Sequence, residues 1–145
     1  MDRNEVPVIV LNSQECWKLL RLETVGRLVT HVGDIVDIVP LNFVVDDESI
    51  VFRSAAGSKL AGLTVNSSVL LEVDRFTSER GWSVVVHGRA EVLEREAEIA
   101  AAAELPLTPM VSSAKPTFVR INVDSVRGRR FLFEGGDLAD VLQEG

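Results

Sequence analysis

Runs of alternating apolar and polar residues recur along this sequence and are separated by short polar turns. Residues 25–32 and 35–45 are two such runs, joined by Gly33-Asp34. Because successive side chains of a strand point to opposite faces, this alternation is typical of half-buried strands, and a Gly-Asp turn between two of them is typical of a hairpin. Residues 49–54 form the next run, so the three runs together predict an antiparallel meander.

Further strand-like runs complete the pattern, and the helical segments between them are short. Strands are predicted at residues 68–75, 82–93, 117–123 and 129–133, with a bulge or kink at Gly88. Helices are predicted at residues 13–22, 58–63 and 94–104, the first opening with Asn12 and Glu15 as in a capping box. No strand–helix–strand repetition is present. The sequence therefore predicts a single α+β domain over residues 1–145, an antiparallel barrel with short flanking helices.

Acidic residues outnumber basic ones. The 22 Asp and Glu against 15 Lys and Arg give a net charge of −7, which disfavours a nucleic-acid binder held by phosphate neutralisation. Charged residues and glycine interrupt every apolar stretch before the ~20 residues that a membrane span needs. The N-terminus lacks the apolar core of a secretory signal, and the single cysteine precludes an internal disulfide. We therefore expect a cytoplasmic protein without nucleic-acid or membrane partners.

Residue types that carry hydrolytic or metal chemistry are sparse. His31 and His87 lie within predicted strands, and neither a nucleophile elbow nor a paired-histidine zinc motif is present. Cys16 lies among the leucines of the first predicted helix, where a buried thiol is usually an inert packing group. One cysteine and two separated histidines do not make a zinc site, so no metal is expected and no catalytic residue is assigned.

The segment that points to a ligand is 50–63, which carries two cations and no acid in an acidic chain. Ser54 and Ser58 offer hydroxyls, an intervening glycine exposes backbone N–H groups, and Arg53 and Lys59 supply positive charge. This combination suits a phosphate group. The alternative is that Ser58 only caps a short helix and that Lys59 is a solvated surface charge.

Five short motifs are spread along most of the chain. They are Glu15-Cys16 with Leu19-Leu20, Val25-Gly26-Arg27-Leu28, Val39-Pro40-Leu41-Asn42-Phe43, Phe52-Arg53-Ser54 with Gly57-Ser58-Lys59, and Gly81-Trp82-Ser83-Val84 with Gly88-Arg89-Ala90. In this order and spacing, the motifs resemble the flavin-binding split-barrel superfamily that includes the pyridoxamine 5′-phosphate oxidases, and above all its small single-domain branch. The resemblance implies an antiparallel split β-barrel with short flanking helices.

The resemblance also implies a homodimer with flavin mononucleotide (FMN) at the subunit interface. It places the FMN phosphate at Phe52, Arg53, Ser54, Ser58 and Lys59, the flavin ring along the backbone of Val39, Pro40, Leu41 and Asn42, and contacts from the partner subunit at Trp82 and Ser83. Pro40 would then mark a place where its strand is not fully paired. Packing in the core or at the interface is the alternative role for Trp82.

The activity that the resemblance implies is that of a flavin-dependent oxidoreductase acting on an unidentified small molecule. The chain departs from the true pyridoxamine 5′-phosphate oxidases in its tail, residues 134–145, which contains no Lys, Arg or His. We therefore do not expect oxidation of a vitamin B6 phosphate. A late group of arginines, which either faces an anionic cofactor or substrate or is solvated at a strand turn, consists of Arg120, Arg127, Arg129 and Arg130.

Three alternatives stay open from the sequence. A deazaflavin can replace FMN, because both present the same ring face and a phosphate near the same atoms, and the late arginines would then hold its longer anionic tail. The protein can also be a flavin carrier or sensor without catalytic activity. Some split-barrel relatives bind haem, for which His31 or His87 is a candidate axial ligand.

Overall fold

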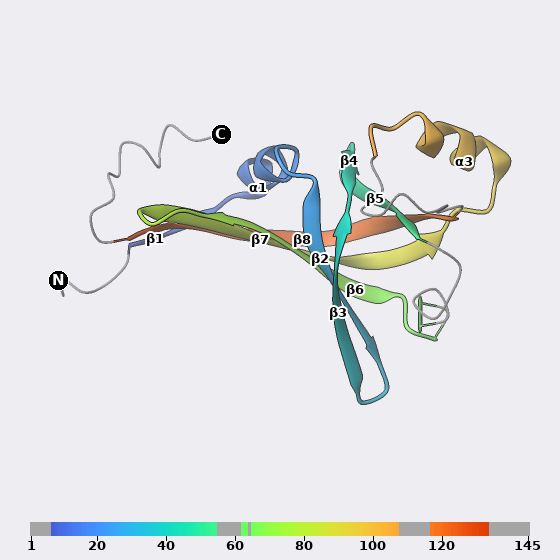
Figure 1. Cartoon of the computed structure of the whole chain (residues 1–145), viewed down its shortest axis with the longest axis horizontal. Helices are drawn as coiled ribbons and strands as arrows, with labels where there is room; N and C mark the ends of the chain where they lie inside the picture. The colour runs from blue at the N-terminus through green and yellow to red at the C-terminus, as the bar shows by residue number, and fades with distance from the viewer. Residues whose placement is uncertain (1–6, 55–61, 64, 108–116, 134–145) are drawn as a thin grey trace.

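The computed structural model describes residues 7–54, 62–63, 65–107 and 117–133 (Figure 1). The strands are β1 (Val8–Leu11), β2 (Val25–Val32), β3 (Ile35–Asn42), β4 (Val44–Asp46), β5 (Ser49–Ser54), β6 (Ser68–Phe76), β7 (Arg80–Val92) and β8 (Thr117–Leu132). Two helices, α1 (Ser13–Leu20) and α3 (Glu96–Ala103), accompany them. Of the predicted features, Ser58, Lys59 and the tail at 134–145 lie outside the described residues.

The described strands form one antiparallel sheet in the order β3-β2-β6-β7-β8-β5-β4, and β1 pairs with β8. The sheet curls into a half-barrel, with α1 against β7 and β8 and with α3 at a separate place along it (Figure 1). The predicted α+β split barrel with short flanking helices is therefore confirmed. None of the described helices is long and apolar enough to cross a membrane.

The predicted meander of the first three runs is confirmed in its antiparallel pairings, since residues 25–32 pair with residues 35–42 and residues 44–46 pair with residues 49–51. β2 and β3 form the expected hairpin, with Gly33 in the left-handed region at a φ of 59°. The run at 35–45 is interrupted at Phe43, however, and β4 and β5 lie at the opposite edge of the sheet from β3. The backbone N–H of Phe43 donates to the carbonyl of Thr24 (2.9 Å), which extends the β2–β3 register by one position before the chain continues into β4. Alternation reveals which face a side chain takes but not which strand lies beside it.

The predicted turn between two last strands is wrong, because β8 is continuous from Thr117 to Leu132. Ser125 and Arg127 are exposed positions of this strand that pair with β7, so their polarity does not mark a turn. Gly128 lies inside β8, where a Cβ atom would approach the Cys16 Sγ atom to 2.8 Å. The irregularity predicted at Gly88 is confirmed, since the β7–β8 register shifts between His87 and Gly88, although the extra residue is Asp124 on β8.

The core lies on the concave side of the sheet and is closed by α1. Asn12 caps this helix, since its side chain accepts from the backbone N–H of Glu15 at 2.8 Å, as the capping pattern predicts. Cys16, Leu19 and Leu20 then point into the main core, which includes residues of most strands. A smaller cluster under α3 contains Val51, Leu93, Ala102 and Phe118. The two clusters lie on opposite faces of β5, which is therefore covered on both sides.

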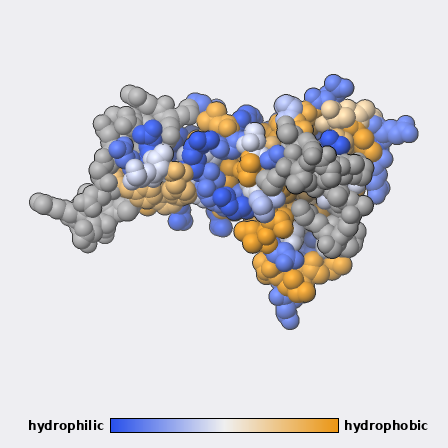
Figure 2. All heavy atoms as spheres, in the orientation of Figure 1, coloured by the Kyte–Doolittle hydropathy of each residue, from blue (hydrophilic) through white to orange (hydrophobic). Residues whose placement is uncertain are grey.

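The β2–β3 hairpin projects away from the rest of the sheet (Figure 1). Three apolar side chains near its tip are largely exposed: Ile35 at 65%, Val36 at 62% and Ile38 at 62%. They belong to the hydrophobic surface that Figure 2 shows over this part of the molecule. A projecting hairpin with exposed apolar residues is typical of a surface that another molecule covers.

Candidate functional site

The predicted phosphate residues on β5 alternate between its two faces. Phe52 is fully buried in the main core. Arg53 lies on the other face, with its guanidinium carbon 5.0 Å from the centre of the Phe118 ring. Ser54 is again buried, at 4% exposure. Arg53 and Ser54 therefore leave the strand on opposite sides, and of the two only Arg53 brings a charge to this end of β5.

The predicted ring-binding residues lie on β3, an edge strand. Among the described residues only β2 pairs with β3, so Pro40 sits where its missing N–H group costs no ladder hydrogen bond. Leu41 is buried in the main core, to which Phe52 also belongs, and Val39 packs against this core. Pro40 is exposed and Asn42 is half-buried. The structure thus brings β3 and β5 within contact distance and leaves one edge of the β3 backbone open along the described chain.

Trp82 and Ser83, the residues assigned to the partner subunit, point to opposite faces of β7. Trp82 is 3% exposed and packs in the main core of its own chain. Ser83 lies half-buried on the outer face, where its hydroxyl donates to Glu72 Oε2 at 3.2 Å. Of the two side chains, only that of Ser83 is therefore placed to face a ligand or a second subunit.

An ionic cluster beside Ser83 was not predicted from the sequence. Arg27 on β2 contacts Glu72 at 2.9 Å and Asp74 at 3.3 Å, both on β6. Burial and a hydrogen bond with Asp74 raise the pKa of Glu72 above its ordinary value, against the opposing effects of Ser83 and Arg27. Alternation along β2 and β6 places these residues on one face, but the pairing of Arg27 with Glu72 joins segments 45 positions apart.

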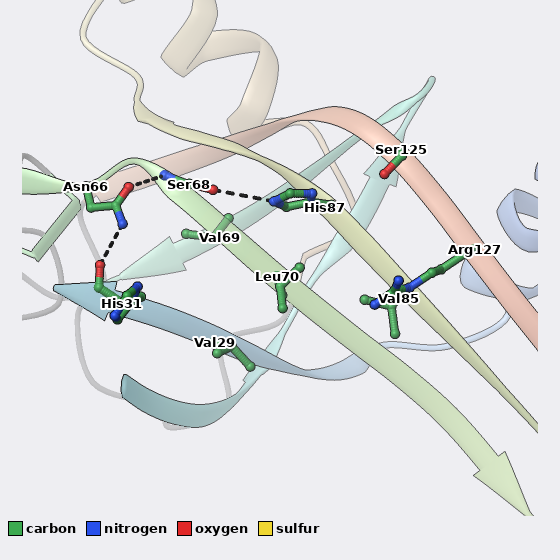
Figure 3. A pocket seen from close by; sticks show the side chains of 10 residues that line it. All are labelled: Val29, His31, Asn66, Ser68, Val69, Leu70, Val85, His87, Ser125 and Arg127. Atoms are coloured by element: carbon green, nitrogen blue, oxygen red, sulfur yellow. Dashed lines mark hydrogen bonds between the residues drawn. The ribbon is translucent and has the colours of Figure 1, made fainter. Parts of the chain in front are cut away.

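A pocket of about 410 Å³ lies on the outer face of the sheet (Figure 3). His31 on β2 and His87 on β7 both line it, although they are far apart in the sequence. Its polar wall is ordered by hydrogen bonds: Asn66 donates to the His31 carbonyl at 2.8 Å and accepts from the Ser68 N–H at 3.1 Å. The Ser68 hydroxyl lies 3.5 Å from His87 Nε2. This convergence could not be predicted from the sequence, because β6 lies between the two strands that carry the histidines.

A second hollow of about 330 Å³ continues along β7 and β8 and is lined by Ser83, Val85, Arg127, Gly128, Arg129 and Phe131. The two hollows share Val85 and Arg127. Figure 3 shows Arg127 extending from β8 toward Val85 on β7. The outer face of β7 and β8 therefore carries one extended depression, which we call the outer trough.

The four late arginines do not form one cluster. Arg120 is half-buried and pairs with Asp46 at 3.0 Å, and it also donates to the Ser49 hydroxyl. Arg130 is buried at 6% exposure, while Arg127 and Arg129 are exposed and line the outer trough. Cys16 is fully buried, and burial raises the pKa of its thiol, as expected of an inert packing group.

Known proteins share both the sequence pattern and the fold. The profile of the pyridoxamine 5′-phosphate oxidase family matches residues 12–130. The chain belongs to this family. A conserved protein of unknown function from Corynebacterium diphtheriae is 43% identical with a TM-score of 0.76, and the similarity covers 87% of this chain and 99% of that one.

Two solved structures similar to this pyridoxamine 5′-phosphate oxidase family member are of proteins described as binding FAD. The FAD-binding protein from Mycobacterium smegmatis is 38% identical with a TM-score of 0.74, covering 86% of this chain and 98% of that chain. An FAD-binding protein from Mesorhizobium loti is 25% identical with a TM-score of 0.71, covering 88% of this chain and 98% of that chain. The fold is therefore that of a family with flavin-binding members.

Proposed function

We propose that the protein binds a flavin and uses it to exchange electrons with a small molecule. The observation that carries this proposal is the 38% identity, over nearly the whole of both chains, to an FAD-binding protein. The residues assigned by resemblance contact the flavin ring and its first phosphate. FMN and FAD have these groups in common. A bound flavin supplies the redox chemistry, so the protein groups need only bind, orient and shield it.

The backbone of Val39 to Asn42 is proposed to lie along the flavin ring. The edge position of β3 supports this, because among the described strands only β2 pairs with it, so a planar ligand can lie along its other edge. Arg53, Ser54, Ser58 and Lys59 are proposed to hold the phosphate. The positive charge of Arg53 at the end of β5, in a chain of net charge −7, favours this placement.

We also propose that the active species is a cytoplasmic homodimer in which Ser83 approaches the flavin of the partner subunit. Two features favour the dimer: the exposed Ile35, Val36 and Ile38 at the β2–β3 hairpin, and the outward orientation of Ser83. The single cysteine, a buried free thiol, is compatible with a reducing compartment.

The flavin proposal is tested by an absorption spectrum of the purified protein, followed by fluorescence titrations with FMN, FAD and a deazaflavin. Lys59→Glu is expected to weaken FMN binding at least tenfold, because it replaces attraction of the phosphate dianion by repulsion. Lys18→Glu, an exposed change on α1, is the matched control and should leave the affinity unchanged. A strong haem band with no flavin binding would replace the proposal by the haem alternative.

The homodimer is tested by light scattering at micromolar concentration. The wild-type protein is expected to have the mass of two chains, and Ile38→Arg to have the mass of one, because a charge at the hairpin cannot be buried without a partner. Val10→Arg, at a position that is 78% exposed on β1, is the matched control. A monomeric wild type contradicts the dimer and leaves the flavin proposal to be judged on the titrations.

A further inference from the structure

The outer trough contains two arginines whose charge is not neutralised by the described chain. Arg127 and Arg129 lie two positions apart on the outer face of β8, and both are exposed. Neither forms an ion pair or a hydrogen bond with any residue that the structure describes, whereas Arg27, Arg75 and Arg120 are each paired with a carboxylate. In a chain with a net charge of −7, two unpaired arginines in a hollow indicate a site for an anion.

The shape of the outer trough indicates an elongated ligand. One end lies where His87 pairs with Ser125, and the other where Gly81 pairs with Phe131. Six residues of strand separate these ends, which corresponds to roughly 20 Å at ~3.4 Å per residue. A single phosphate would contact only a small part of this length.

An aromatic platform closes one end of the outer trough. Phe131 stacks with Phe76 at 5.9 Å and with Phe133 at 6.5 Å between ring centres. Because its ring is held by these neighbours and lies beside Arg129, it offers a fixed apolar surface next to a positive charge. A planar base can stack there while its phosphates reach the arginines.

The carboxylate that contacts Ser83 belongs to an ionic cluster. Glu72 accepts from Ser83, which lines the trough, but it also contacts Arg27 at 2.9 Å. Because Arg27 is shared between Glu72 and Asp74, this cluster keeps at most one negative charge on the β6 side, against the two positive charges of Arg127 and Arg129 in the trough.

We propose that the outer trough binds an adenosine diphosphate group, with the two phosphates at Arg127 and Arg129 and the adenine against Phe131. This group occurs in FAD and in the nicotinamide dinucleotides, so the trough takes either the adenosine half of the flavin or that of the electron donor. The redox role of this ligand rests on the proposed function. Binding of the adenosine diphosphate group itself does not, because it depends only on residues of β7 and β8.

The test is isothermal titration of the wild-type protein with ADP and with inorganic pyrophosphate. Arg127→Gln and Arg129→Gln are each expected to weaken both probes about tenfold, the loss of one charge-assisted contact. Phe131→Leu is expected to weaken ADP but not pyrophosphate. Arg89→Gln, an exposed arginine of β7 outside the trough, is the matched control and should change neither. Thermal unfolding of each variant establishes that it is folded.

Further titrations with FMN, FAD and NADPH distinguish the two sources. If FAD binds more tightly than FMN, and if this difference is lost in the double variant Arg127→Gln/Arg129→Gln, then the ligand of the trough is the adenosine half of FAD. Equal binding of FMN and FAD, with NADPH binding lost in the double variant, identifies the electron donor. If ADP does not bind at millimolar concentration, or binds equally to the double variant, the proposal is overturned. If neither flavin binds while ADP does, the proposed function fails and the adenosine diphosphate site stands.

Discussion

The two faces of β7 serve different purposes. Its inner residues Trp82, Val84 and Val86 are buried in the main core, while Ser83 and His87, between or next to them in sequence, line hollows on the outer face. Because side chains alternate, neighbouring residues contribute separately to stability and to binding. A substitution on the inner face should unfold the protein, and one on the outer face should alter only its ligands.

The largest effect is expected from Trp82→Ala. Removing this buried ring leaves a cavity in the main core and is expected to lower the free energy of unfolding by about 3–5 kcal/mol. Urea unfolding followed by circular dichroism measures the change. A loss of less than about 1 kcal/mol would show that Trp82 contributes mainly to an interface, as the resemblance to flavin proteins implies, rather than to its own core.

Gly88→Val tests the bulge that separates the two ends of β7. A Cβ atom at this position would meet the carbonyl oxygen of Asn122, part of a backbone that cannot easily move. We expect a loss of about 1–3 kcal/mol, typical of overpacking. Arg89→Ala, at the next and exposed position, is the control and should stay within about 0.5 kcal/mol of the wild type.

Glu72→Gln is expected to change how stability depends on pH. The pKa of Glu72 is raised in the folded protein from its ordinary value of 4.5, so between these two values the folded state binds more protons than the unfolded state. This group therefore lowers the free energy of unfolding as pH rises through that window. The variant should gain stability relative to the wild type with increasing pH, as measured by urea unfolding from about pH 4 to about pH 8. A constant difference across this range would contradict the raised pKa.

The smallest effect on stability is expected from Ser83→Ala, within about 0.5 kcal/mol, because Ser83 lies on the outer face. Its hydroxyl lowers the pKa of Glu72, so the variant should raise that pKa further. Nuclear magnetic resonance titration of the Glu72 carboxyl measures the shift. A comparison with Trp82→Ala then shows directly how differently two adjacent residues act.

The local alternation of apolar and polar residues predicted most strands of this fold. Features that depend on pairing between distant segments could not be predicted in this way. β2 and β5 have the predicted bounds, because alternation and turn residues report on the strand itself. The division of the run at 35–45 into β3 and β4 and the continuity of β8 were not predicted, since both depend on which strand lies alongside. In the candidate site, the assignment of Ser83 by resemblance stays a prediction, whereas Arg27, Glu72 and Asp74 converge only through the pairing of β2 with β6.

β8 pairs with β1, β5 and β7, and this has a consequence for synthesis of the protein. Synthesis proceeds from the N-terminus, so β1, β5 and β7 leave the ribosome before the strand that joins them exists. The half-barrel cannot close during translation until β8 emerges. Until then, the edges of β1, β5 and β7 that later pair with β8 stay exposed. Folding of this chain is therefore completed late, and the nascent chain depends on its surroundings to keep these edges from pairing with other chains.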